Sequence, residues 1–127
     1  MSTRSRIAIE KQDGTVESIY CHFDGYLSNN GEILQNHYST KEKMKKLIEL
    51  GDISSLGDTP EETVAYHRDR GEDLNITSYP DVATLFDNGY NSSVEYVYCL
   101  TKENRLLVSN GGPVADLYLA LQGEDVL

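Results

Sequence analysis

Residues 5–23 of the chain read SRIAIEKQDGTVESIYCHF, and this stretch decides how the rest of the chain folds. Apolar and polar side chains alternate through residues 5–11 and again through residues 15–23, as they do in strands with one buried face. Asp13-Gly14 lies between the two runs and is typical of a two-residue hairpin turn, because glycine accepts a positive φ. The stretch therefore predicts a β-hairpin.

The same alternation assigns the two faces of the second strand. Ile19, Cys21 and Phe23 share one face, which we expect to belong to the core. The opposite face carries Val16, Ser18, Tyr20 and His22. Cys21 and Cys99 both fall in apolar, strand-like runs, so we expect two buried thiols and neither a metal knuckle nor a redox motif. A Cys21–Cys99 disulfide is the alternative.

Outward from the hairpin, short helices alternate with strands. Helical spacing predicts one helix near residues 33–38, and a Ser39/Glu42 capping box predicts a second that ends at Gly51. Residues 63–69 alternate well enough for a third strand, with a helix beginning at Thr59-Pro60 as the alternative. Further helices are expected around residues 82–86 and over 114–121.

A second hairpin completes the expected set of elements. Residues 94–101 and 105–109 have strand character and are joined by a tight turn at residues 102–104. No linker or repeat interrupts the chain, so we expect a single domain over residues 1–127. The predicted fold class is α+β, with a mainly antiparallel sheet of about five strands (two hairpins plus one strand) and about three or four short helices.

Charge restricts the partners of this chain. Its 127 residues include 11 basic and 21 acidic side chains, which gives a net charge of -10. Residues 1–70 carry nine basic and twelve acidic side chains, whereas residues 71–127 carry two and nine. Such a field repels nucleic acid and favours basic protein surfaces, including those that themselves hold nucleic acid. The alternative is that the charge serves solubility alone.

The hydropathy pattern predicts no contact with a membrane. No apolar run approaches the roughly 18 residues of a membrane span. The first residues pass directly into the first strand without the apolar region of a secretion signal. We therefore expect a cytoplasmic protein.

Two short clusters could carry chemistry. The first follows the second strand and comprises His22, Asp24 and Tyr26, and the second comprises His67, Arg68 and Arg70. If strands continue through both, each histidine shares a face with a carboxylate, which would set its tautomer or raise its pKa. No spacing of a nucleophile, a phosphate loop or a metal-binding helix occurs, so we predict no catalytic residue, no metal and no cofactor.

The acidic C-terminal half offers a surface for a partner protein. Tyrosine is a residue type that protein interfaces favour, and this chain has nine. Ordinary packing within a sheet is the alternative role for them. The predicted partner-binding residues are Asp81, Asp87, Tyr90, Glu95, Tyr96 and Tyr98.

Five short segments of the sequence together resemble segments of known proteins. They are SRI at 5–7, YCHFDGY at 20–26, HY at 37–38, LIELGDIS at 47–54 and AYHRDRG at 65–71. As a set they resemble a family of small, mostly uncharacterised proteins of bacteriophages and prophages, over roughly residues 5–72. The resemblance implies a setting in a host bacterial cell, because small accessory phage proteins often counter host defences, anti-CRISPR proteins among them. It implies no activity for any particular residue.

Three hypotheses for the function follow. The leading one is a non-enzymatic phage accessory protein that inhibits a host defence complex, as an anti-CRISPR protein does, by binding a basic, nucleic-acid-handling surface. The alternative is a small-molecule protein, either a sponge or an enzyme for a nucleotide-like ligand, in which the His22 and His67 clusters form one pocket. The third is an assembly role with homo-oligomerisation.

Overall fold

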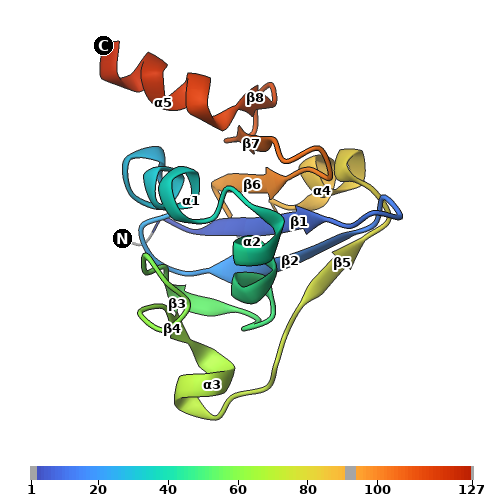
Figure 1. Ribbon diagram of the computed structural model, residues 1–127, viewed down its shortest axis with the longest axis vertical. Helices are drawn as coiled ribbons and strands as arrows, with labels where there is room; N and C mark the ends of the chain where they lie inside the picture. The colour runs from blue at the N-terminus through green and yellow to red at the C-terminus, as the bar shows by residue number, and fades with distance from the viewer. Residues whose placement is uncertain (1–2, 91–93, 127) are drawn as a thin grey trace.

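A mixed β-sheet runs through the chain (Figure 1). The computed structural model describes residues 3–90 and 94–126, and within these ranges eight strands form one sheet. The strand order is β4-β3-β2-β1-β6-β7-β8, and β5 also pairs with β2. The strands are β1 (Ser5–Glu10), β2 (Val16–Cys21), β3 (Ile53–Ser55), β4 (Val64–Ala65), β5 (Thr77–Tyr79), β6 (Tyr96–Leu100), β7 (Leu106–Ser109) and β8 (Ala115–Asp116).

The predicted sheet of about five mainly antiparallel strands is therefore wrong. Both expected hairpins are present, as β1-β2 and β6-β7. They join through a parallel pair, β1 beside β6, and β2 also pairs in parallel with β3. The additional strands have two or three residues each, which is too short for an alternating pattern to reveal.

The two hairpins share one turn geometry. Lys11 N–H donates to Thr15 O at 2.8 Å, and Gly14 N–H donates to Lys11 O at 2.9 Å. Gly14 has a φ of 87°, so the connection is a three-residue loop with a left-handed last residue and not the two-residue turn that was predicted. The β6-β7 turn repeats the pattern with Asn104 at a φ of 65° in the place of the glycine.

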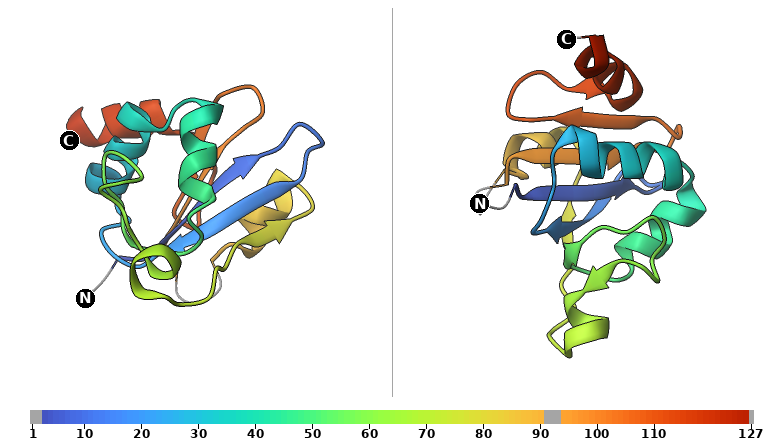
Figure 2. Two further views of the ribbon diagram at one scale, coloured as in Figure 1. Left: turned by 60° about the horizontal axis from the view of Figure 1, so that its bottom comes forward. Right: turned by 90° about the vertical axis from the view of Figure 1, so that its left-hand side faces the viewer.

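Helices cover both faces of the sheet (Figure 2). On one face, α1, α2 and α5 pack over a large core that includes Ile7, Ile19 and Tyr98. On the other face, α4 covers a smaller core with Ala8 and Val97. The helices are α1 (Glu32–His37), α2 (Lys41–Ile48), α3 (Tyr66–Arg70), α4 (Val82–Asn88) and α5 (Leu117–Val126), and a π-helical turn, η1 (Leu27–Gly31), leads into α1.

The outer edge of β2 is divided between two partners. Its first half pairs with β5, from Val16 to Ser18, whereas its last residue, Cys21, pairs with β3. Between them the Tyr20 N–H donates at 2.9 Å to Oδ1 of Asp52, the residue that precedes β3. A carboxylate side chain thus fills the gap where the two neighbouring strands diverge.

The strand predicted for residues 63–69 is wrong, as only Val64 and Ala65 are extended and α3 follows at once. Asp69 Oδ2 accepts the Ala65 N–H at 2.8 Å, which fixes the first turn of this helix. The alternative start at Thr59 produces a single turn, in which the Thr63 N–H donates to Thr59 O at 3.1 Å. Local side-chain acceptors therefore override the alternation.

Three smaller expectations also need correction. Thr40, not Ser39, caps α2, since its side chain accepts the Lys43 N–H. Phe23 is 43% exposed and lies outside the core because β2 ends at Cys21. The final helix begins at residue 117 rather than 114, and the two residues before it form β8, which extends the sheet beyond β7.

Both cysteines are free and buried, as predicted. Cys21 lies in the larger core and Cys99 in the smaller one, so they are on opposite faces of the sheet. Burial raises the pKa of the Cys21 thiol to about 11 and that of Cys99 to about 12. The disulfide alternative is thus excluded by the arrangement of the strands.

Candidate functional site

The His22 cluster forms a small aromatic group at the end of β2. The Tyr20 hydroxyl and His22 Nδ1 share a hydrogen bond of 2.8 Å, and the Phe23 ring stands edge-on to the imidazole with 4.6 Å between centroids. Asp24 adopts a left-handed backbone with a φ of 58°, which turns the chain out of the strand. The expectation that His22 and Asp24 share a strand face is therefore wrong. Tyr26 is 39% exposed farther along the same loop.

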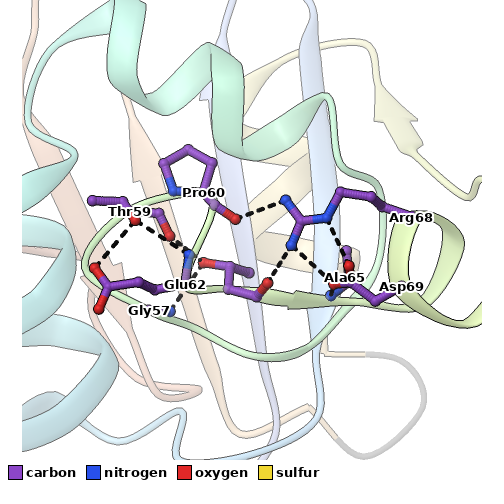
Figure 3. Close-up of polar contacts among 8 residues, drawn as sticks. Gly57, Thr59, Pro60, Glu62, Ala65, Arg68 and Asp69 are labelled. Atoms are coloured by element: carbon purple, nitrogen blue, oxygen red, sulfur yellow. Dashed lines mark hydrogen bonds and ion pairs between the residues drawn. The ribbon is translucent and has the colours of Figure 1, made fainter.

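The second cluster is a structural network (Figure 3). Arg68 forms a bidentate pair with Asp69, in which Nε and Nη2 each lie 2.9 Å from a carboxylate oxygen. Its Nη1 donates to Pro60 O at 2.8 Å and its Nη2 also donates to Thr63 O. The guanidinium lowers the pKa of Asp69 to about 2. Arg68 thereby ties α3 to the loop before β4, and four of its five N–H donors are in use.

The other members of the second cluster also have local partners. His67 Nδ1 lies 2.7 Å from Glu72 O, and the Arg70 guanidinium carbon lies 5.2 Å from the centre of the Tyr66 ring. None of the six predicted ligand-binding residues lines the surface hollow near α2 or the one at the start of β6. Arg68 is held in the network of Figure 3, so it is not available to a single pocket made of all six predicted ligand-binding residues. That the other five residues bind a ligand stays a prediction.

Two of the six predicted partner-binding residues have roles inside the fold. Asp81 caps α4, because its Oδ1 accepts the Thr84 N–H at 2.7 Å, and this bond lowers the pKa of the Asp81 carboxyl. Tyr98 is fully buried, and its hydroxyl donates to Gly25 O at 2.7 Å. A partner cannot contact Tyr98, and Asp81 cannot be changed without loss of the cap.

Three of the other four lie together where β6 begins. Tyr90, Glu95 and Tyr96 line one hollow of about 320 Å³, which we call the Tyr90 hollow. Asp87 is exposed in the last turn of α4, three residues before Tyr90. The remaining lining residues are Val94 and Asn110. The sequence predicted these tyrosines and carboxylates as one partner-binding set, and the fold places Tyr90, Glu95 and Tyr96 around one hollow.

Sequence reasoning missed two other groups. A hollow of about 260 Å³ lies between α2 and the loop of Figure 3, with Lys43, Lys46 and Asp58 in its lining, and Asp58 approaches His37 Nε2 at 3.6 Å. Arg4 and Arg6 lie on the α4 side of the sheet. Their spacing of two residues, directly before and within β1, was the available signal for a shared face.

Comparison of the chain with protein-family models, with curated proteins and with solved structures yields no match. Among residues 3–90 and 94–126, no group of three or more His, Cys, Asp or Glu side chains is placed to hold a metal ion. In the same part of the chain, every helix is too short or too polar for a membrane crossing. The candidate site is therefore argued from the geometry of the chain itself.

Proposed function

We propose that this chain is a non-enzymatic inhibitor that docks the Tyr90 hollow and its acidic border onto a basic, nucleic-acid-handling surface of a host protein. The setting is that of a phage accessory protein acting against a host defence complex, as anti-CRISPR proteins do. The observation that carries the proposal is the hollow that Tyr90, Glu95 and Tyr96 line at the start of β6, with the exposed Asp87 three residues before Tyr90.

The two carboxylates are available to a partner. Asp87 and Glu95 are both exposed, and within the described residues neither forms an ion pair or a side-chain hydrogen bond. Because the chain has a net charge of -10, its exposed carboxylates repel one another. A basic partner surface reduces this repulsion when it binds. Arg or Lys side chains of the partner would meet the carboxylates in place of phosphate groups.

The tyrosines supply contact area beside the charges. Tyr90 and Tyr96 are half-buried, so each ring is held by the fold and loses little side-chain freedom when a partner covers it. Aromatic anchors within a charged border are the arrangement in which a few residues carry most of the binding energy. The inhibition would then be steric, because the chain occupies the surface that the nucleic acid needs.

A pull-down from bacterial lysate tests the proposal. The tagged chain is compared with the double variant Asp87→Asn/Glu95→Gln and with the matched control Glu49→Gln/Glu103→Gln, which changes the charge equally at exposed sites away from the hollow. Each lysate is used with and without nuclease. Circular dichroism spectra and melting temperatures establish that the variants are folded.

The proposal expects one nucleic-acid-binding complex to be captured in nuclease-treated lysate by the chain and by the control. The double variant should retain at most about a tenth of the captured complex, because each desolvated charge pair contributes about 1 kcal/mol or more. Equal capture by the double variant would show that the acidic border is not the binding surface. Capture that disappears with nuclease would show that nucleic acid bridges the two proteins.

A further inference from the structure

Two arginines lie on the α4-side face of the sheet, and Arg6 lies beside the end of α4, where a Cβ at Gly89 would be 3.6 Å from Arg6 Cδ. The register places Arg6 of β1 opposite Tyr20 of β2. Arg6 is only 8% exposed, and its Nη1 donates to Ser18 Oγ at 3.0 Å. Arg4 precedes β1 on the same face, and its carbonyl accepts the Glu95 N–H at 2.9 Å. The pair lies where β6, β1 and β2 run side by side.

Both guanidinium groups are incompletely satisfied. In the described residues, three buried side-chain nitrogen or oxygen atoms lack a hydrogen-bond partner, and two of them are Arg4 Nε and Arg6 Nε. Neither arginine forms an ion pair within the same residues. Buried donors without acceptors are rare in native proteins and cost free energy, so a pair of them on one face needs a physical reason.

The remaining nitrogens of the two groups reach the surface. Among the described residues, Nε is the only Arg4 nitrogen that is both buried and without a partner. The two Nη atoms of Arg4 form no hydrogen bond with these residues and are not sealed from solvent. The same holds for Nη2 of Arg6. These three terminal nitrogens are therefore the donors that remain for an oxyanion.

The nearest carboxylates leave the pair uncompensated. Burial raises the pKa of the Asp52 carboxyl, and the nearby Arg6 guanidinium opposes this effect. The Oδ1 atom of Asp52 already accepts a hydrogen bond from the Tyr20 N–H. Glu95 is exposed and extends from the neighbouring strand entrance without a bond to either arginine. Apart from Ser18 Oγ, which accepts from Arg6 Nη1, the arginine donors therefore have no acceptor among the described residues.

An aromatic shelf borders the arginines. Burial raises the pKa of the Tyr20 hydroxyl and the positive charge of Arg4 opposes this effect, while the same hydroxyl shares a hydrogen bond with His22. Phe23 packs on His22 with one side of its ring in solvent. Planar rings beside paired guanidinium groups suit a ligand that joins a phosphate to a flat ring.

We propose that Arg4 and Arg6 form a binding site for a phosphate group, carried by a small molecule whose flat ring lies along Tyr20, His22 and Phe23. The terminal Nη atoms of the two guanidinium groups donate to the phosphate oxygens, which supply acceptors that the described residues do not. The site differs from the Tyr90 hollow in its residues and in the sign of its charge. It therefore stands or fails independently of the proposed inhibition.

The test observes the arginine Nε–Hε signals of the full chain by ¹H–¹⁵N NMR while inorganic phosphate or adenosine monophosphate is added at constant ionic strength. Because Arg4 Nε and Arg6 Nε are buried, we expect both Hε protons to exchange slowly enough to serve as reporters. The variant is Arg4→Gln, because Arg6 is bonded into the sheet and its loss would disturb folding. The control is Arg105→Gln, whose side chain is exposed and pairs with Asp116 at 3.5 Å.

We expect saturable shifts of the Arg4 and Arg6 signals, an affinity at least about tenfold weaker in Arg4→Gln, and an unchanged affinity in Arg105→Gln. Tighter binding of adenosine monophosphate than of inorganic phosphate would place the ring on the shelf, whereas equal affinity would limit the site to the phosphate. Equal and non-saturable shifts of every arginine signal would overturn the proposal. Unchanged binding by a folded Arg4→Gln variant would overturn it as well.

Discussion

Asp52 bridges the place where β5 and β3 diverge from β2, and its replacement tests how the sheet is closed there. In Asp52→Ala the Tyr20 N–H loses its acceptor, while the backbone of residue 52 remains held by hydrogen bonds to Asn75 and Tyr66. A part-buried donor left without a partner costs about 1–2 kcal/mol. Asp52→Asn keeps the acceptor oxygen and should retain the stability of the wild type.

Urea unfolding at neutral pH measures the effect. For a domain of this size the slope is about 1.5 kcal/mol per molar urea, so the midpoint of Asp52→Ala should fall by roughly 1 M with an unchanged slope. The asparagine variant should unfold at or slightly above the wild-type midpoint. If asparagine is as damaging as alanine, the charge and not the hydrogen bond stabilises this edge, and the account of the divided strand is wrong.

The pH dependence gives the same experiment a second readout. Burial raises the pKa of Asp52 above its ordinary value of 3.8, so the folded state disfavours the charged carboxylate. The wild type therefore loses stability relative to Asp52→Asn as the pH rises through the titration of this carboxyl, and the difference is constant above it. A difference that instead shrinks with rising pH would contradict the direction of the shift.

Other predictions follow from single contacts. Gly14→Ala should lower the free energy of unfolding by about 1–2 kcal/mol in urea titrations, because residue 14 is left-handed while a Cβ there meets open space; no change would refute the turn assignment. The Asp69 carboxyl should titrate near pH 2 by NMR, and the network that needs its charge should weaken as the pH falls from about 4 toward that value. A pKa near the ordinary value of 3.8 would show that Asp69 is not paired with Arg68. Cys21 and Cys99 should resist a thiol reagent at pH 8 in the native state and react after unfolding, because burial raises both pKa values; rapid native reaction of either would contradict its placement.

Local signals predicted the fold only where they were strong. The alternation around Asp13-Gly14 identified the first hairpin, and the residues on either side of Asn104 identified the second. The parallel contact of β1 with β6 joins segments some ninety residues apart, as in the pair of Ile7 with Tyr98, and no local pattern encodes such a contact. The α3 segment was misassigned because an alternating sequence was converted to a helix by the acceptors of Asp69 and the donors of Arg68.

The sequence indicated which residue types and which half of the chain form the candidate site, but not which individual residues belong to it. Acidic charge and tyrosine content pointed to the C-terminal half, and three of the six chosen residues line the Tyr90 hollow there. Tyr98 was misplaced because alternation assigns it to the face of Tyr96 but does not show that the helices over this face bury it completely. Arg4 and Arg6 were overlooked because their missing hydrogen-bond partners are visible only in three dimensions.

The most direct test of the proposed inhibition is competition on the captured partner. The purified partner is bound to a fluorescently labelled oligonucleotide, and the chain is added while the anisotropy is recorded. The account predicts full release of the oligonucleotide, with a midpoint at least about tenfold higher for Asp87→Asn/Glu95→Gln and unchanged for Glu49→Gln/Glu103→Gln. A stable ternary complex that keeps the oligonucleotide bound would contradict it.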